Sequence, residues 1–197
     1  MRIILASGSP RRKELLTKIY KTFEIITSDA DENINSSHPG EIVEELAHRK
    51  ARAVYNELES VQDEEFLIIG ADTIVYYDGD VLGKPADEEE AKSMISMLSE
   101  RTHQVYTGVC LIAKTGGKEQ EIRFHDVTNV TFSTIDRFDI EEYVRSGGPM
   151  DKAGAYGIQD DFAKHVKKID GDYNNVVGLP VAKIYDILKK NKLPLQS

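Results

Sequence analysis

Short apolar runs alternate with longer segments of helical periodicity along most of the chain. Apolar runs bounded by glycine, proline or polar residues predict strands, and they cover residues 2–6, 23–27, 66–77, 81–82, 105–114, 121–133, 155–159 and 165–169. Apolar residues three and four apart predict helices over 39–58, 87–98, 136–145 and 181–190, with one more beginning at Pro10. This order predicts an α/β protein with a mixed sheet flanked by helices.

Composition and charge narrow the class of protein. The 197 residues fit a single domain over 1–197, and 25 basic against 34 acidic residues give a net charge of −9. An acidic chain is a poor partner for nucleic acid or a membrane surface, so any anionic ligand needs a local cluster of cations. The single cysteine, Cys110, lies in an apolar run, which predicts a buried thiol and excludes a disulfide framework. Without a signal peptide or a spanning segment, the chain is expected to be cytoplasmic.

The turn between the first strand and the first helix gathers hydroxyls and guanidinium groups. Ser7, Ser9, Arg11 and Arg12 follow one another closely, with Ser9 and Pro10 in the positions of an N-cap and a first helical residue. Free backbone amides at a helix start attract anions, and arginine binds phosphate in a bidentate manner. The turn is therefore either a phosphate-binding loop or an ordinary capped helix with two solvated arginines.

Asp72 interrupts the most strand-like segment of the chain. An ionised carboxylate in a buried strand is costly unless it meets a cation, a metal or several donors. Asp72 is thus a general base, a metal ligand or both, or else a strand-end carboxylate that accepts backbone N–H bonds. Lys50 falls in the apolar stripe of its helix. It either extends its ammonium past the core edge or directs it into a site.

Two further segments carry candidate site residues. Lys84 stands between Gly83 and Pro85, where the proline favours an extended backbone, and it is either a site ammonium or a solvated turn lysine. Residues 151–159 are rich in small side chains that let a ligand approach, and Gln159 offers a donor and an acceptor to a base edge. The histidines show no zinc spacing, and the chain has no P-loop or dinucleotide-binding motif.

Six strings, in this order and spacing, resemble the Maf (septum-formation) family of nucleoside triphosphate pyrophosphatases. They are ASGSPRR at 6–12, KA at 50–51, GADT at 70–73, KP at 84–85, DKAGAYGIQ at 151–159 and VGLP at 177–180. The resemblance runs from Ile4 to about Lys190. It implies hydrolysis between the α- and β-phosphates with a divalent cation, Mg²⁺ or Mn²⁺, and the string at 151–159 is similar to the branch that prefers dTTP and UTP.

The resemblance also implies roles for single residues. Asp72 matches the proton acceptor for the attacking water, and Glu32 matches an acidic position near the metal, with Asp72 as a second ligand. The positions tied to base choice are Arg11, Thr73 and Gln159. Together with the cationic turn, the polar positions that would bind phosphate are Ser7, Ser9, Arg11, Arg12, Lys50 and Lys84.

The implied fold is an elongated, Maf- and ITPase-like α/β structure with two lobes around a central cleft, and it often forms homodimers. The chain departs from the family pattern after Gln159, where Asp160-Asp161-Phe162 replaces a glycine-containing loop. Two other functions stay open. One is a nucleotide-binding regulator of cell division in which hydrolysis is secondary, although a pure binder gains nothing from Asp72 beside a triphosphate. The other is a phosphosugar enzyme, which Gln159 disfavours.

Overall fold

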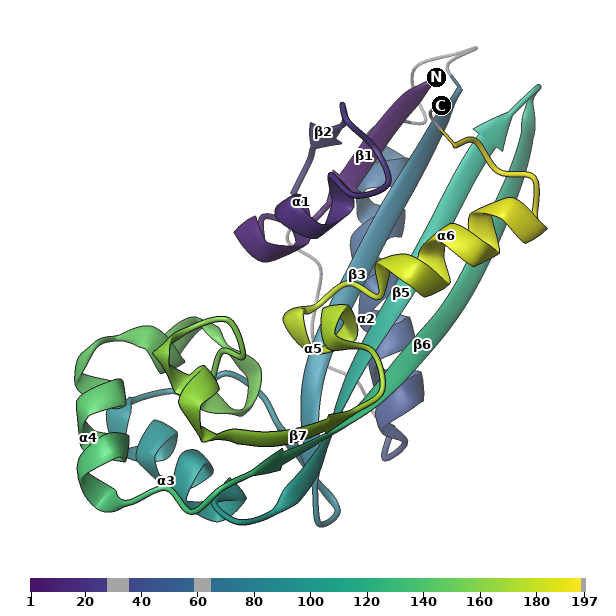
Figure 1. Cartoon of the computed structure of the whole chain (residues 1–197). Coiled ribbons are helices and arrows are strands. Elements are labelled where there is room, and N and C mark those ends of the chain that lie inside the picture. The colour runs from purple at the N-terminus through teal and green to yellow at the C-terminus, as the bar shows by residue number, and fades with distance from the viewer. Residues whose placement is uncertain (28–35, 59–64, 196–197) are drawn as a thin grey trace. The chain divides into compact units, whose positions relative to one another are not determined.

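The computed structural model describes residues 1–27, 36–58 and 65–195. Its strands are β1 (Arg2–Ala6), β2 (Glu24–Ile25), β3 (Phe66–Tyr77), β4 (Asp80–Leu82), β5 (Thr102–Thr115), β6 (Lys118–Phe132) and β7 (Val166–Asp170). They form one sheet of seven strands in the order β2-β1-β3-β5-β6-β7, with β4 paired to β3 (Figure 1). β1 runs parallel to β2 and β3, whereas β4 and β7 pair antiparallel to β3 and β6. The predicted mixed sheet is confirmed.

The helices are α1 (Pro10–Leu16), α2 (Pro39–Leu58), α3 (Glu88–Leu98), α4 (Arg137–Arg145), α5 (Tyr173–Val177) and α6 (Val181–Lys190). Three short 3₁₀ helices follow α4: η1 (Gly148–Asp151), η2 (Ala153–Ala155) and η3 (Asp161–His165). Asp87 caps the start of α3, since its side chain accepts from the amide of Glu90, and the carboxylate of Glu90 accepts from the amide of Ala86. None of the helices in the described ranges is both long and apolar enough to cross a membrane.

The predicted strand over 155–159 is wrong. Gly154 and Ala155 have φ values of +66° and +60°, in the left-handed region, so the backbone there cannot extend into a strand. The apolar residues that suggested a strand, Tyr156 and Ile158, are instead buried from a turn without pairing in the sheet. α5 was not predicted, because its five residues are too few to show a helical period.

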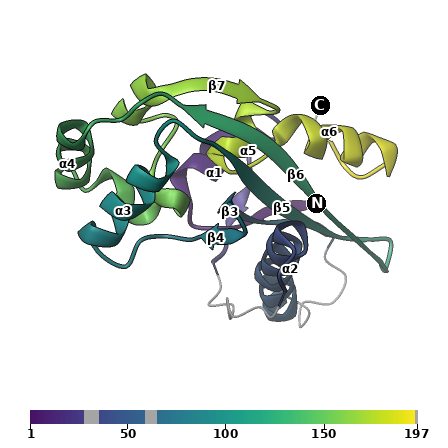
Figure 2. The same cartoon turned by 90° about the horizontal axis from the view of Figure 1, so that it is seen from below.

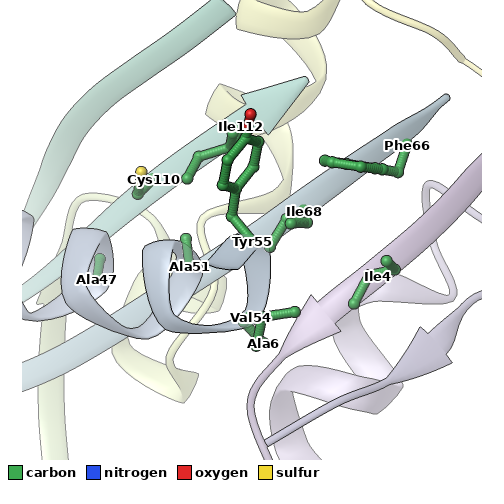
Figure 3. Packing of buried hydrophobic residues seen from close by; sticks show 10 residues of the cluster. All are labelled: Ile4, Ala6, Ala47, Ala51, Val54, Tyr55, Phe66, Ile68, Cys110 and Ile112. Atoms are coloured by element: carbon green, nitrogen blue, oxygen red, sulfur yellow. The ribbon is translucent and has the colours of Figure 1, made fainter. Parts of the chain in front are cut away.

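The chain divides into two compact units. Unit 1 comprises Met1–Asp72, Thr107–Asp126 and Gly178–Ser197, and unit 2 comprises Thr73–Tyr106 and Val127–Val177. In unit 1, α2 packs on one face of β1, β3 and β5, while α1 and α6 lie on the other face (Figures 1 and 2). The core beneath α2 is formed by Ile4, Ala6, Ala47, Ala51, Val54, Tyr55, Phe66, Ile68, Cys110 and Ile112 (Figure 3).

Close packing of α2 on β3 depends on the glycine at position 70. A side chain on Gly70 would run into the backbone carbonyl of Ala47 and lie 2.9 Å from Cβ of Ala51. Gly70 therefore lets the backbone of α2 lie close to β3. Cys110 is buried in the same core, as predicted, and burial raises the pKa of its thiol to about 12.

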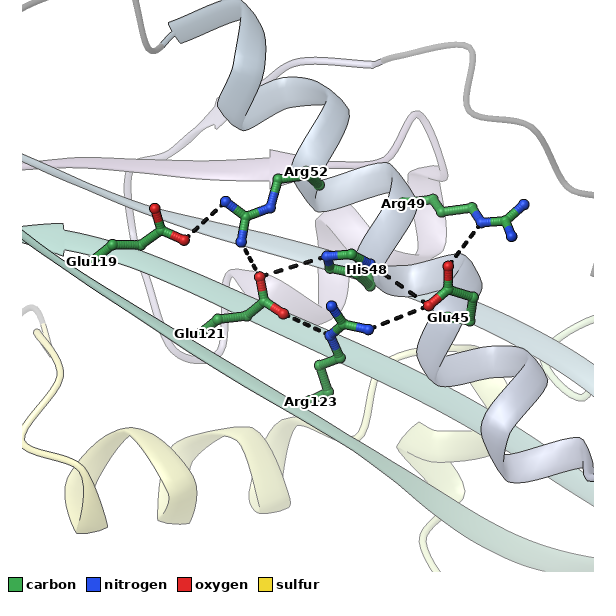
Figure 4. Close-up of polar contacts among 7 residues, drawn as sticks. All are labelled: Glu45, His48, Arg49, Arg52, Glu119, Glu121 and Arg123. Carbon is green, nitrogen blue, oxygen red and sulfur yellow. Dashed lines mark hydrogen bonds and ion pairs between the residues drawn. The ribbon is translucent and has the colours of Figure 1, made fainter.

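The polar side of α2 is tied to β6 by a charge network of Glu45, His48, Arg49, Arg52, Glu119, Glu121 and Arg123 (Figure 4). The guanidinium of Arg52 contacts the carboxylates of Glu119, at 2.8 Å, and Glu121. Arg123 contacts Glu121 at 2.6 Å and Glu45 at 3.2 Å. Glu121 and Glu45 thus each serve more than one cationic partner.

Unit 2 has an aromatic core built on the strands. His103 of β5 lies 4.7 Å from the ring of Phe132 of β6 in an edge-to-face contact. The Nε2 atom of His103 is 2.8 Å from the hydroxyl of Tyr156, and the ring of Phe162 packs 5.2 Å from that of Phe132. Burial lowers the pKa of His103 to about 4, so its imidazole is a neutral core group at physiological pH.

Candidate functional site

The turn between β1 and α1 holds Arg12 in a fixed position. Ser9 caps α1, its Oγ accepting from the backbone amide of Arg12 at 3.4 Å, and Pro10 follows at the first helical position, as predicted. The guanidinium of Arg12 donates to Oγ of Ser7 at 3.3 Å and to the carbonyl of Gly178 at 2.9 Å. Both serine hydroxyls accept in these bonds, and each keeps its own O–H proton for donation to a ligand.

Fewer backbone amides of this turn are available to bind an anion than the sequence suggested. The amide of Ser9 donates to Oγ of Ser7, that of Arg12 donates to Oγ of Ser9, and Pro10 has no N–H. The expectation that free backbone amides would face an anion is therefore wrong for these residues. The side chains of the turn remain able to donate to a phosphate.

Lys50 and Asp72 form the central polar contact of unit 1. Nζ of Lys50 donates to Oδ1 of Asp72 at 2.6 Å, and the two side chains are only 19% and 12% exposed. Lys50 thus directs its ammonium to a buried carboxylate, and Asp72 meets a cation. The roles expected of the two residues stay predictions. Ala6 of β1 lies opposite Gly70 of β3, so Ser7 and Asp72 both follow the same end of this parallel pair.

Arg11 and Thr73 are the sequence neighbours of Arg12 and Asp72. Arg11 lies in the first turn of α1 and is half-buried. Thr73 follows Asp72 along β3 and is also half-buried, and because consecutive strand residues point to opposite faces, the two side chains diverge. Their assignment to base choice stays a prediction.

In unit 2 the structure joins the loop of Lys84 to the segment that carries Gln159. The amide of Gly154 donates to the carbonyl of Gly83 at 3.0 Å, next to Lys84. Both Lys84 and Gln159 are exposed, whereas residues 154–158 are buried. Gln159 is therefore the polar side chain that this segment presents to solvent.

Asp72 is one carboxylate that could contribute a ligand to a divalent cation. Glu32 lies outside the described residues. Within 1–27, 36–58 and 65–195, no group of three or more histidine, cysteine, aspartate or glutamate side chains could hold a metal. Mg²⁺ commonly takes one or two protein carboxylates and completes its shell with water and substrate phosphates. Asp72, with one oxygen engaged by Lys50, can supply such a ligand.

Sequence reasoning missed two sets of residues. The carbonyl of Gly178 binds Arg12, and the signal was the string at 177–180, which had no role assigned to it. The side chains of Tyr143, Lys152 and Asp160 surround the segment of Gln159. Nothing in the sequence places Tyr143 there, because it belongs to the separate helix α4.

Known proteins match this chain over nearly its whole length. A family model described as "Maf-like protein" matches residues 2–191. A protein of Agathobacter rectalis is 49% identical over 95% of this chain and 96% of its own length, and one of Bacillus cereus is 47% identical over 96% and 95%. A protein of Lachnoclostridium phytofermentans is 44% identical over 95% and 94%. All three are named dTTP/UTP pyrophosphatase.

Among solved structures, the Ham1 protein of Staphylococcus aureus aligns with 97% of this chain and 100% of its own, with a TM-score of 0.46 and 11% identity. That likeness is too weak to carry an argument about fold or function.

Proposed function

This chain belongs to the Maf family, and on that premise we propose that it hydrolyses dTTP and UTP to the monophosphate and pyrophosphate. The names of relatives at 44–49% identity, which cover almost the full length, support this substrate class. The observation within the molecule that carries the proposal is the contact of 2.6 Å between Lys50 and Asp72 at the end of β1. It gives one site both a carboxylate and a cation.

Asp72 is proposed as the general base. Phosphoryl transfer depends mostly on positioning and charge stabilisation, with one group orienting or deprotonating the nucleophile. Asp72 lies on the long strand β3, so its carboxylate has a rigid support, and Lys50 fixes the direction of one oxygen. The carboxylate can then take the proton of a water that attacks the α-phosphorus.

The phosphates are proposed to bind cations and hydroxyls, first of all those of the β1–α1 turn. A chain with a net charge of −9 needs such a cluster to attract a triphosphate. Arg12 is oriented by Ser7 and Gly178, which favours bidentate binding of a phosphate by its guanidinium. The other proposed phosphate ligands are Ser7, Ser9, Arg11, Lys50 and Lys84.

A divalent cation, Mg²⁺ or Mn²⁺, is proposed as the cofactor, held by Asp72 and by Glu32. Bound beside the phosphates, such an ion would supply a Lewis acid that neutralises charge developing on the phosphate oxygens. Lys50 would keep the Asp72 carboxylate oriented toward that region through the bond to Oδ1. Arg12 and the serine hydroxyls would bind phosphate oxygens independently of the ion.

Gln159 is proposed to read the base, together with Arg11 and Thr73. Uracil and thymine present an O4 acceptor and an N3–H donor, which one amide side chain can match with a donor and an acceptor. Cytosine reverses this pattern at position 4, so CTP should be a poor substrate. The extra methyl of dTTP is worth only about 1–3 kcal/mol even in a close-fitting pocket, so dTTP and UTP should be used comparably.

The test is a panel of UTP, dTTP, CTP, ATP and GTP with Mg²⁺ or Mn²⁺, in which pyrophosphate and orthophosphate are assayed separately. We expect UTP and dTTP to be hydrolysed with pyrophosphate as the first product, and the other nucleotides to react poorly. Orthophosphate release without added pyrophosphatase would contradict the proposed bond cleavage. Tight binding of UTP without hydrolysis under either metal would favour the nucleotide-binding regulator instead.

A further inference from the structure

Gln159 lies at the corner of a tight turn whose two ends are bound by one hydroxyl. The amide of Asp160 donates to the carbonyl of Gly157 at 3.3 Å, which closes a β-turn with Ile158 and Gln159 at its centre. At one end, the amide of Gly157 donates to the hydroxyl of Tyr143 at 3.1 Å. At the other end, that hydroxyl donates to Oδ2 of Asp160 at 3.2 Å. Tyr143 therefore bridges both ends of the turn.

Lys152 holds the same carboxylate from a second direction. Its Nζ lies 3.1 Å from Oδ2 of Asp160, 2.6 Å from the carbonyl of Gly148 and 2.7 Å from Oδ1 of Asp151. The side chain of Lys152 is only 11% exposed, and an ammonium has three protons to donate, which matches these three oxygens. The ammonium of Lys152 thus binds three oxygens of unit 2, although Lys152 stands in one of the strings that match the family.

The ring and hydroxyl of Tyr143 have separate functions in this arrangement. The ring packs 4.8 Å from that of Phe162 and belongs to the aromatic core. Burial, and next the charge of Asp160, raise the pKa of the Tyr143 hydroxyl, so it stays protonated and remains a donor to the carboxylate. Removal of the hydroxyl alone would release the turn and leave the core packing in place.

The turn also fits its neighbours closely. A side chain on Gly157 would run into the carboxylate of Asp160 and would lie 2.6 Å from Cε of Lys152. Because the contacts leave no space at this position, the turn has little freedom to shift while the three side chains stay in place. Ile158 is 7% exposed and anchors the turn, while Gln159 next to it is exposed.

We propose that Tyr143, Lys152 and Asp160, here called the turn clamp, are positioning residues that set base selectivity by fixing the backbone that carries Gln159. The inference rests on the proposed role of Gln159 as the group that reads the base. It also explains the departure from the family pattern after Gln159. The carboxylate of Asp160 is directed to Tyr143 and Lys152, so it supports the turn where a glycine-containing loop was expected.

The decisive variant is Tyr143→Phe, which keeps the ring against Phe162 and removes both bonds of the hydroxyl. We expect the ratio of kcat/KM for UTP to that for CTP to fall about tenfold, the usual scale for losing a hydrogen bond that involves a charged group. Asp160→Asn should lower the ratio in the same direction by a smaller factor, because an amide still accepts from Tyr143. Asp161→Asn is the matched control: it removes one charge from the exposed neighbouring residue and should leave the ratio unchanged.

A second measurement separates positioning from general damage to the fold. Exchange of the Gly157 amide proton should become faster in Tyr143→Phe, because that amide loses its acceptor. A merely structural role would lower kcat/KM for UTP and CTP by the same factor. An unchanged UTP-to-CTP ratio in both Tyr143→Phe and Asp160→Asn would overturn the proposal. A ratio near one in the unmodified protein would instead overturn the base reading by Gln159, and the role of the clamp with it.

Discussion

Helix α2 carries ion pairs of two different kinds on two of its sides. On one side, Lys50 contacts Asp72 at 2.6 Å, with side chains 19% and 12% exposed. On the other, the charge network of Figure 4 links α2 to β6, and its Arg52 and Glu121 side chains are 29% and 21% exposed. The first contact places a carboxylate within an apolar strand, whereas the second joins partly exposed residues of α2 and β6.

The difference supports a division between a network that serves the fold and a contact proposed to serve the chemistry. In the network, Glu121 binds both Arg52 and Arg123, so loss of one partner leaves another in place. A buried pair gains little for stability, because desolvation of both charges offsets their attraction, and apolar residues often do as well. Asp72 therefore stands in β3 at a position where an apolar residue would suit the fold. This supports the role in catalysis proposed for it.

The largest expected effect is that of Asp72→Asn. The substitution keeps the shape of the side chain and its acceptor for Lys50, but it removes the proposed proton acceptor. We expect kcat for UTP to fall by about 10²- to 10⁴-fold, the usual contribution of a general base. Binding of UTP in the absence of the divalent cation, measured by calorimetry, should be retained, since a negative charge near the phosphates is lost. Full activity in this variant would exclude Asp72 as the base.

The second prediction compares two cations of α2 by the same substitution. Lys50→Met should lower kcat/KM for UTP by at least about tenfold, because a phosphate ligand and the partner of Asp72 are both lost. Arg52→Met removes ion pairs of the network and the cation–π contact of its guanidinium with Tyr55, 4.8 Å from the ring centre, so kcat/KM should not change and the free energy of unfolding should fall by about 1–2 kcal/mol. Steady-state kinetics and urea unfolding of both variants provide the measurement. Equal losses of activity in the two variants would contradict the division between the two sides of α2.

The elements of the fold could be predicted where the apolar pattern had a clear period. The long strand β3, the helix α2 and the N-cap at Ser9 all came from local rules of spacing and capping. The segment 155–159 could not, because its apolar residues are buried by a turn with left-handed residues, and the pattern alone does not distinguish this turn from a strand.

The sequence named candidate residues for the site, but it predicted only some of the contacts that they make. The sequence singled out Lys50 and Asp72 as wrongly placed for pure structure, and the structure joins them. It did not indicate that Gly178 binds Arg12 or that Tyr143 binds the turn of Gln159, since these contacts link segments far apart in the chain. The expected cleft and the role of Glu32, which lies outside the described residues, stay predictions.

The smallest expected effect concerns acid and the histidine of the charge network. Burial, and next the charge of Arg123, lower the pKa of His48 from its ordinary value of 6.5, against the opposing charges of Glu121 and Glu45. The ring is therefore neutral at pH 7, and its contacts of 3.7 Å to Glu45 and 3.6 Å to Glu121 are too long for hydrogen bonds. The network is held by its arginines, and His48 fills space among them.

The sign of the pH effect follows from this lowered pKa. As the pH falls below about 6.5, the unfolded chain takes up the proton at His48 before the folded protein does, so the folded state loses stability in acid. His48→Gln removes this proton uptake, and its free energy of unfolding should decline less between pH 7.5 and pH 5.5, with a difference below about 1 kcal/mol because the site is partly exposed. Urea unfolding of both proteins at each pH measures the difference. Parallel curves would mean that the arginines and glutamates alone account for the response of the network to acid. The value of kcat/KM at fixed pH should be the same in both proteins, because His48 lies in the charge network, on the other side of α2 from Lys50.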